Sequence, residues 1–275
     1  MTQSLDIGSL ASLFRYPVKS MMGEELNSSR VTPRGLQGDR AFALADAATG
    51  KIASAKNPSR WPGLFQFRAA FAQPLGGNGS LPPVSITFPD GATASTGDNN
   101  LEAELSSSLG RPVRFLSAAP QAGTLEEYWP DIDGLPRRDT VTDEAMPSGT
   151  FFDLGIIHLI TTATLDSFRS RYPGGRFEVR RFRPNLVIET LPHLADFPEN
   201  DWNEKALCIG SEVRLKITGP CARCVMTTLP QGDLPKDTGI LKTAVQHNKA
   251  QVGSYASVLQ PGLIRRGDPV RLEPL

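Results

Sequence analysis

The sequence predicts a mainly β protein with a few short helices, arranged in two unequal parts. Short segments of alternating polar and apolar residues recur along the chain, and proline and glycine are dense between them. Only two stretches carry apolar residues at helical spacing. Because domains usually contain about 100–200 residues, a chain of 275 residues is expected to form two such parts.

The composition is that of a globular protein with no general affinity for polyanions. Hydrophobic residues make up 39% of the chain and charged residues 21%, which is enough to build a core. The 29 basic and 29 acidic side chains cancel, so no long-range field attracts nucleic acid or an acidic membrane surface. No apolar run approaches the ~20 residues of a membrane span, and the N-terminal residues do not resemble a signal peptide. We therefore expect a cytoplasmic protein without nucleic-acid or membrane partners.

The N-terminal segment is predicted to place polar side chains at the end of a strand. Residues 13–20 are typical of a strand that Pro17 ends, so Lys19 and Ser20 lie just beyond it. A turn between two glycines follows, and Arg40 stands directly before the next predicted strand. Strand ends are therefore the expected source of the polar groups at one rim of the fold.

The middle of the chain is predicted to hold short strands and one long connection. Residues 57–98 combine alternating segments with many prolines and glycines, which favours antiparallel strands joined by loops. Residues 126–149 have no clean period and are predicted to be an irregular connection between the two parts, long enough to lie over a site. Beyond it, strands are predicted at 156–160, 185–188, 213–217 and 267–272.

Two helices are predicted from their caps and their apolar spacing. Asp98 is the candidate cap of a helix over residues 101–109, and Gly110 stands where a C-terminal cap is expected. The second helix is expected to be capped by Thr162 or Thr164 and to end before a Pro-Gly-Gly turn.

The clearest chemical feature is the segment Gly219–Cys224, Gly-Pro-Cys-Ala-Arg-Cys, at the end of a predicted strand. A Gly-Pro turn there projects two thiols and a guanidinium off the sheet. Arg223 is expected to lower the pKa of the adjacent thiol by favouring its charged form, which makes Cys224 a candidate thiolate. A soft thiolate selects soft or borderline metals, molybdenum with its own sulfur ligands among them.

Three other interpretations of the two cysteines stay open on spacing alone. A structural zinc site needs four ligands, and the spare ones are Cys208 and three histidines scattered along the chain. A thioredoxin-like dithiol pair belongs at a helix N-terminus, whereas residues 225–228 are predicted to continue as a strand. The third interpretation is that the two cysteines pack as small hydrophobic residues.

Cations and hydroxyl groups recur at the ends of the other predicted strands. Such groups suit a phosphate-bearing ligand, although each alone is equally typical of a solvated edge. The arginines at 180, 181 and 183 crowd one stretch, for which a salt-bridged surface is the alternative. The chain holds no Walker, Gly-x-Gly-x-x-Gly or His-Glu-x-x-His motif. The cations, hydroxyl groups and amide at these strand ends are those of Lys19 with Ser20, Arg40, Thr161 with Thr162, and Arg183 with Asn185.

Four of these motifs together resemble the MOSC family, named for the C-terminal domain of molybdenum cofactor sulfurase. Within that family the chain looks most like bacterial relatives of the mitochondrial amidoxime-reducing component. The resemblance implies a MOSC N-terminal β-barrel domain over residues 1–125 and a β-barrel MOSC domain over residues 126–275. The motifs are Tyr16-Pro17-Val18-Lys19-Ser20, Gly38-Asp39-Arg40, Phe182-Arg183-Pro184-Asn185 and Cys221-Ala222-Arg223-Cys224.

The resemblance implies a molybdenum–molybdopterin cofactor (Moco) bound to this chain. Cys224 is implied as the metal ligand and catalytic residue, and Cys221 is free to be structural. Ala222 stands where the eukaryotic reductases often have a small hydroxyl residue, which removes one hydrogen bond. The residues implied to contact the pterin and its phosphate are Lys19, Ser20, Arg40, Thr161, Thr162, Arg183, Asn185, Arg223 and Tyr255.

The implied activity is that of a molybdenum-dependent oxidoreductase that reduces small N-hydroxylated compounds. Its electrons are expected from a separate flavoprotein or iron–sulfur protein. One alternative is a carrier of the cofactor or of sulfur, which uses a Cys224 thiolate or persulfide. The chain lacks the pyridoxal-phosphate domain that precedes MOSC domains in sulfurases, which favours the oxidoreductase. Another alternative is a β-barrel binding module with inert cysteines.

Overall fold

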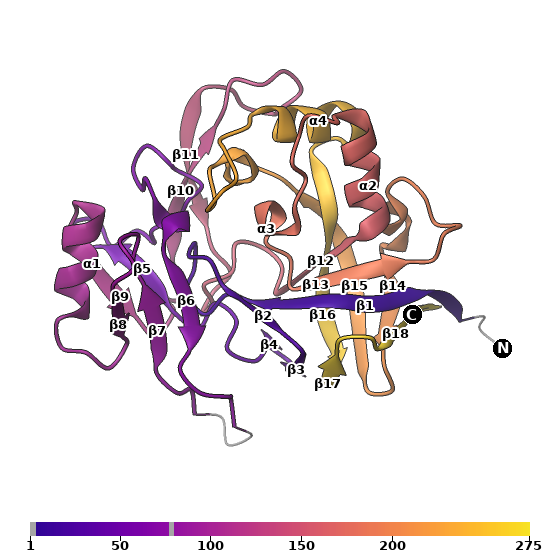
Figure 1. Ribbon diagram of the computed structural model, residues 1–275, viewed down its shortest axis with the longest axis horizontal. Coiled ribbons are helices and arrows are strands. Elements are labelled where there is room, and N and C mark those ends of the chain that lie inside the picture. Colours follow the sequence, from indigo (N-terminus) through magenta and orange to yellow (C-terminus); the bar gives the residue numbers. More distant parts are fainter. Residues whose placement is uncertain (1–3, 77–79) are drawn as a thin grey trace.

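The computed structural model describes residues 4–76 and 80–275, and it is mainly β as predicted. Seven strands close into a barrel at one end of an elongated molecule, and β2 (Glu24–Leu26) extends the sheet from β1 (Figure 1). In spatial order the barrel strands are β1 (Leu5–Arg15), β13 (Leu186–Thr190), β12 (Ile157–Thr161), β16 (Gln251–Gln260), β15 (Val213–Ala222), β14 (Lys205–Ile209) and β18 (Pro269–Pro274).

The first strand closes a barrel whose other strands come from the C-terminal half. β1 pairs with β18 at its start and with β13 further along, so one strand joins both open edges. The change of partner occurs near Gly8, which has φ +145 and would hold a Cβ 1.8 Å from the carbonyl oxygen of Glu189. Only glycine fits there. The predicted division at residues 125 and 126 therefore does not describe every contact, because β1 lies within the C-terminal barrel.

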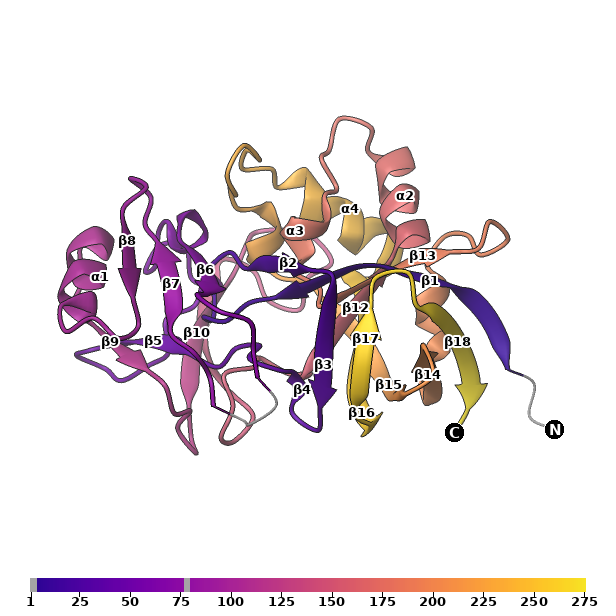
Figure 2. The same cartoon turned by 60° about the horizontal axis from the view of Figure 1, so that its bottom comes forward.

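The N-terminal half consists of small sheets and one helix beside the barrel (Figure 2). A core of aromatic and aliphatic side chains fills it, with Phe67 and Leu105 fully buried. β17 (Gly262–Arg265), from the C-terminal half, joins its first sheet. The other elements are β3 (Ser28–Thr32), β4 (Gly35–Leu36), β5 (Ala43–Asp46), η1 (Leu64–Gln66), β6 (Arg68–Phe71), β7 (Val84–Thr87), β8 (Thr93–Ser95), α1 (Leu101–Leu109) and β9 (Val113–Leu116).

Helices gather at one end of the barrel, where α2 and α4 pack against it (Figure 1). Stacked phenylalanine rings, among them Phe168 and Phe177, fill the space between them. None of the helices in the described ranges has the length and hydropathy to cross a membrane. The elements are α2 (Thr162–Arg171), α3 (Val179–Phe182), η2 (Pro198–Trp202), η3 (Val225–Thr228) and α4 (Gly239–Asn248).

Both helices predicted from the sequence are present, but both predicted N-terminal caps were wrong. The Thr161 hydroxyl, one residue earlier than predicted, accepts a hydrogen bond from the backbone N–H of Thr164 and caps α2. At α1 the carboxylate of Asp98 instead accepts from the backbone of Ser95, in a local turn that competes with capping. The C-terminal cap at Gly110 is confirmed, with φ +62.

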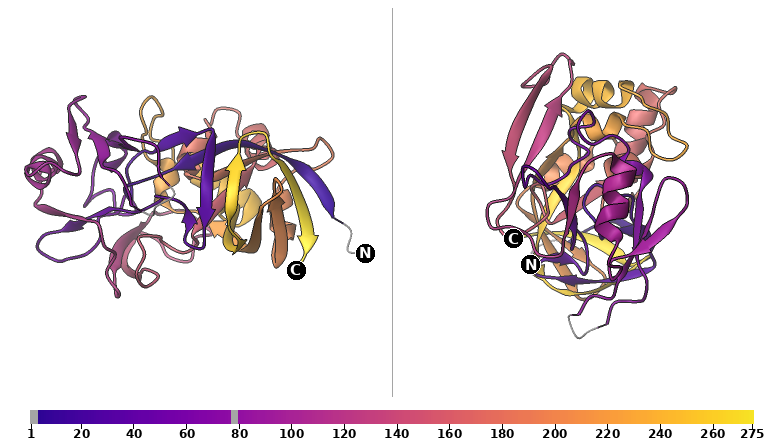
Figure 3. Two further views of the ribbon diagram at one scale, coloured as in Figure 1. Left: turned by 90° about the horizontal axis from the view of Figure 1, so that it is seen from below. Right: turned by 90° about the vertical axis from the view of Figure 1, so that its left-hand side faces the viewer.

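The connection predicted to be irregular is a β-hairpin, of β10 (Thr124–Trp129) and β11 (Thr140–Ala145), that stands along one side of the molecule (Figure 3). Ion pairs stabilise the hairpin, and its strands lack the strong apolar alternation by which strands are predicted from a sequence. This explains why the hairpin was not predicted. On one side the ammonium of Lys51 lies 3.1 Å from Glu126 and 2.7 Å from Asp143. The sequence-based domain boundary falls inside β10.

We predict that Asp46 stabilises the fold in a pH-dependent way. Its buried carboxylate lies 2.9 Å from Arg60 and 3.0 Å from Arg111. Burial raises the pKa of Asp46, but the two arginines and the backbone N–H groups of Ala48 and Thr49 lower it to about 2. A folded-state pKa below the unfolded value gives stability that is present above about pH 4 and is lost as the pH falls towards about 2.

The test compares urea unfolding of wild type and Asp46→Asn at several pH values. We expect a loss of about 1–2 kcal/mol at pH 7, unchanged at pH 5 and shrinking below about pH 4. A difference that stays constant down to pH 3 would contradict the assignment. Asp90→Asn, at an exposed turn, is the matched control.

Candidate functional site

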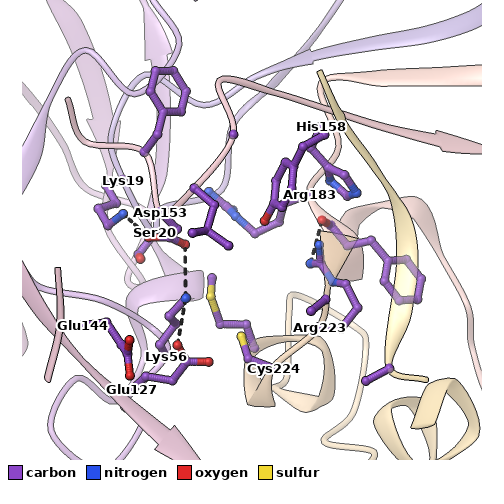
Figure 4. Close-up of a pocket in the computed structure, with 18 of the residues that line it drawn as sticks. Lys19, Ser20, Lys56, Glu127, Glu144, Asp153, His158, Arg183, Arg223 and Cys224 are labelled. Carbon is purple, nitrogen blue, oxygen red and sulfur yellow. Dashed lines mark hydrogen bonds and ion pairs between the residues drawn. The ribbon is translucent and has the colours of Figure 1, made fainter. Parts of the chain in front are cut away.

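A cavity of about 470 Å³ lies where the two halves meet (Figure 4). Its walls come from the segment after β1, the β10–β11 hairpin, the segment before β12, the end of α3, and the corner between β15 and η3. Because these segments are far apart in the sequence, the cavity exists only in the folded chain.

Eight of the ten predicted site residues line this one cavity. Thr161 and Thr162 do not, and each has a structural partner instead. The buried Thr161 hydroxyl donates to Glu199 at 2.7 Å, and the Thr162 hydroxyl lies 3.2 Å from that of Thr190. The residues that line the cavity are Lys19, Ser20, Arg40, Arg183, Asn185, Arg223, Cys224 and Tyr255.

Arg183 is a buried cation in the cavity wall without a carboxylate partner among the described residues. Its guanidinium lies over the rings of Tyr16 and Phe65, at 4.2 and 5.2 Å. One of its nitrogens, Nη1, is buried and has no hydrogen-bond acceptor within the part of the chain that the structure describes. Burial lowers the pKa of Arg183 to about 10. A buried guanidinium with a free donor is costly unless an anion binds it, so this wall suits an anionic ligand.

An ion-pair network that the sequence did not reveal crosses the cavity. Lys19 pairs with Asp153, and the ammonium of Lys56 lies 2.9 Å from Glu127 and 3.8 Å from Asp153 (Figure 4). Burial opposes ionisation of Asp153, but the charges of the two lysines hold its pKa well below the usual range. Lys19 also donates to the carbonyl of Phe151 at 2.8 Å. These groups hold three walls of the cavity together.

Asn185 holds the two halves together through its side-chain amide. The amide nitrogen donates to Asp39 at 2.9 Å and to the carbonyl of Phe14 at 3.3 Å, and its oxygen accepts from the backbone of His158. Asp39 in turn accepts from the backbone N–H of Tyr16. The amide's two donors are both used within the protein, so Asn185 serves mainly as a joint rather than as a free hydrogen-bonding group.

The two cysteines of the Cys-Ala-Arg-Cys motif lie in different surroundings. Arg223 lowers the pKa of Cys224 as predicted, but burial outweighs it, so the prediction that Cys224 ionises readily was wrong. Arg223 Nη1 lies 2.8 Å from the Sγ atom of Cys221, which is fully buried. Burial opposes ionisation, but Arg223 and then His158 lower the pKa of Cys221 to about 6. Burial, followed by the charge of Glu127, raises the pKa of Cys224 to about 11. The partly exposed Cys224 thiol faces the cavity, and Cys221 does not line it.

Residues 225–228 form the short 3-10 helix η3, not the predicted continuation of a strand. The hydroxyls of Thr227 and Thr228 donate to backbone carbonyls three residues earlier, a local alternative to strand pairing. The fully buried guanidinium of Arg181 donates to the carbonyls of Thr227 and Leu229. Arg181 therefore fixes the turn that follows Cys224.

Unfavourable backbone conformations gather around the cavity. Eight non-glycine residues have positive φ within residues 4–76 and 80–275, and five of them line the cavity. Each such residue costs about 1–3 kcal/mol, and a cluster of them indicates a functional site. The five are Ser20, Arg40, Arg183, Lys249 and Ala250.

The cysteines do not belong to a group of protein ligands. All three are free thiols, and within the described ranges no three histidine, cysteine or acidic side chains gather as metal ligands. The described residues therefore do not support a structural zinc site. A metal held here through Cys224 would need its other ligands from a cofactor.

Models of two protein families match this chain. Residues 7–97 match the MOSC N-terminal beta barrel domain, and residues 151–271 match the MOSC domain. Human mitochondrial amidoxime-reducing component 1 is 27% identical over 97% of this chain and 83% of its own length. The molybdenum cofactor sulfurase of Drosophila grimshawi is 29% identical over 95% of this chain, which spans 34% of that protein. The solved structure of the YuaD protein from Bacillus subtilis, 10% identical over 100% of both chains with a TM-score of 0.50, shares the fold alone.

The fold and the two matched domains define a MOSC-domain protein with a MOSC N-terminal β-barrel domain, as the motifs predicted. The chain is homologous to the mitochondrial amidoxime-reducing component.

We predict that Asn185→Ala destabilises the protein by about 2–4 kcal/mol, because the carbonyl of Phe14 and the backbone N–H of His158 lose their side-chain partner and Asp39 keeps only Tyr16 and Arg40. Urea unfolding measures the loss. Asn200→Ala, which removes one hydrogen bond between exposed and buried amides at 2.7 Å, is the control and should cost less than about 1 kcal/mol. Equal losses of stability in the two variants would contradict the conclusion that Asn185 holds the two halves together.

Proposed function

We propose that this chain binds the molybdenum–molybdopterin cofactor in the cavity and reduces N-hydroxylated compounds. The observation that carries the proposal is the cavity itself, where the Cys224 thiol and the unpartnered Arg183 guanidinium face the same space. Homology to an amidoxime-reducing component supports the reaction class. The N–O bond is cleaved with two electrons and two protons, and the oxygen leaves as water. A separate flavoprotein or iron–sulfur protein supplies the electrons.

The residues present fit such a cofactor. Arg183 Nη1 and Arg223 Nε are buried donors that lack acceptors among the described residues, and a phosphate provides such acceptors. Lys19, Ser20 and Arg40 complete this basic, hydroxyl-bearing wall. Cys224 offers one thiolate, and a pterin dithiolene brings sulfur ligands of its own. When bound, the cofactor supplies the two-electron redox chemistry of molybdenum.

The chain's own groups prepare the space around Cys224. Lys56 and Glu127 are close enough to change the pKa of the Cys224 thiol in opposite directions. A thiol must lose its proton to ligate a metal, and the positive charges of Lys56 and Arg223 favour that loss. Two apolar residues of the hairpin loop, Leu135 and Pro136, also line the cavity.

A carrier of the cofactor or of sulfur is the second candidate function. The similarity to molybdenum cofactor sulfurase extends over 95% of this chain, which favours this candidate. A cofactor carrier would bind molybdenum through Cys224 without reducing N-hydroxylated compounds, whereas a sulfur carrier would hold a Cys224 persulfide and need no molybdenum.

We predict near-stoichiometric molybdenum in protein expressed in a host that makes the cofactor. Cys224→Ala should lower the molybdenum content at least about tenfold, because the thiolate is the only protein ligand proposed. Mass spectrometry measures the metal, and Cys208→Ala and Cys221→Ala are controls that should keep it.

Turnover separates the two candidates. Reduction of benzamidoxime by the loaded protein with a chemical reductant supports the oxidoreductase, and molybdenum without turnover supports the carrier. Wild-type protein without molybdenum, from a host in which another molybdoenzyme is loaded, would contradict the oxidoreductase and the cofactor carrier and would leave the sulfur carrier.

We also predict opposite effects of Arg183→Gln on cofactor retention and on stability. The variant should lose most of its pterin and molybdenum, because a buried partner of the phosphate is gone. The cofactor-free variant should be no less stable than cofactor-free wild type, because an unpaired buried cation opposes folding. Arg180→Gln, which removes a surface arginine paired with Glu178 and Asp233, should change neither. Loss of stability with full cofactor retention would contradict the role of Arg183.

A further inference from the structure

A side chain of the β10–β11 hairpin places a planar cation against two residues that line the cavity. Arg137, in the loop between the two strands, has its guanidinium 5.8 Å from the ring centroid of Trp129. The same guanidinium lies 3.7 Å from Oε1 of Glu144. Trp129 and Glu144 both line the cavity, and Arg137 does not. A ring face and a carboxylate thus hold one guanidinium between them.

Hydrogen bonds fix the ring and the carboxylate relative to each other. The indole N–H of Trp129 donates to the Thr142 hydroxyl at 2.9 Å, and that hydroxyl donates to Glu144 at 2.6 Å. Thr142 pairs with Glu127 across the hairpin, so all of these side chains lie on one face of it. In Figure 4, Glu144 lies beside Glu127 on the side of the cavity that also holds Lys56. The two groups are therefore prearranged before any ligand binds.

We propose that Trp129 and Glu144 form a clamp for the planar amidinium or guanidinium group of a ligand, with Arg137 as its internal stand-in. An aromatic face attracts a planar cation, and a carboxylate pairs with its N–H groups. Arg137 is held weakly: its side chain is 53% exposed, and 3.7 Å is beyond hydrogen-bond distance. A small ligand with the same chemistry can displace it.

The clamp deepens the proposed function and rests on it for its biological meaning. Removal of oxygen from an amidoxime gives an amidine, a strong base that is a planar cation at neutral pH. The clamp therefore recognises the reduced base more strongly than the neutral amidoxime. The amidine product is therefore expected to inhibit, because the clamp favours a planar cation over an uncharged ligand of the same shape.

The test is calorimetric titration of benzamidine into the protein as isolated with its cofactor. Glu144→Gln should weaken benzamidine binding about fivefold to tenfold. Arg137→Gln should strengthen it severalfold, because the internal competitor is removed. Binding of benzamide, which has a similar shape without the charge, should be insensitive to Glu144→Gln.

Two neighbouring residues provide matched controls. Asp143→Asn removes an adjacent carboxylate that pairs with Lys51 on the other side of the hairpin. Arg138→Gln removes an adjacent arginine that pairs with Asp131 and Asp133. Neither should change benzamidine binding, and thermal unfolding checks that every variant is folded.

Equal affinity of wild type and Glu144→Gln, or equal weakening by Asp143→Asn, would overturn the clamp. So would an Arg137→Gln variant that binds no more tightly than wild type. The proposed function fails separately, through missing molybdenum or missing turnover. Because the titration needs no turnover and can be repeated on cofactor-free protein, failure of the clamp and failure of the proposed function are distinguishable.

Discussion

The site depends on the hydrogen bond between the side chains of Asn185 and Asp39, which joins residues 146 positions apart. Asn185 begins the turn into β13 and also binds the backbone of β1 and β12, so one amide fixes three barrel strands. Asp39 belongs to the N-terminal half, directly before Arg40. Arg183 lies two residues before Asn185. The two arginines therefore face one cavity because this joint brings their neighbours together.

The charged residues of the cavity fall into two groups with different roles. Lys19 with Asp153 and Lys56 with Glu127 are ion pairs that hold the walls in register and largely cancel. Arg183 has no such partner among the described residues, and the guanidinium of Arg223 meets a thiol and a carbonyl. Positive charge remains in excess at one wall only. An anionic cofactor would be recognised there, while the paired groups keep the rest of the cavity near neutral.

The sequence predicted the fold class and most of the cavity because strand ends and turn glycines report local geometry. It could not tell which face a side chain takes. Arg223 and Cys221 are two residues apart on extended backbone and so share a face, which is why the guanidinium meets Cys221 and not its neighbour in the sequence. Thr161 stands at a strand end as predicted, but its hydroxyl points to the cap of α2.

Other features of the cavity had no signal in the sequence. In the sequence, Lys56 and Asp153 cannot be distinguished from ordinary surface charges. Their ion pair forms only when the hairpin packs beside them. The arginines of the Arg180 to Arg183 stretch differ only by burial: Arg180 is paired at the surface, Arg181 is buried against carbonyls, and Arg183 faces the cavity. Long-range packing decides these roles, and periodicity does not encode it.

Several features of the cavity are unfavourable for the protein alone. Five residues in left-handed backbone, an unpartnered buried guanidinium and a thiol whose pKa is raised to about 11 all oppose folding or ionisation. A ligand that accepts from Arg183 and replaces the thiol proton relieves the last two and stabilises the folded state by mass action. If the chain binds the proposed anionic cofactor, this strain is preorganisation for it, and binding would link the stability of both halves to the cofactor.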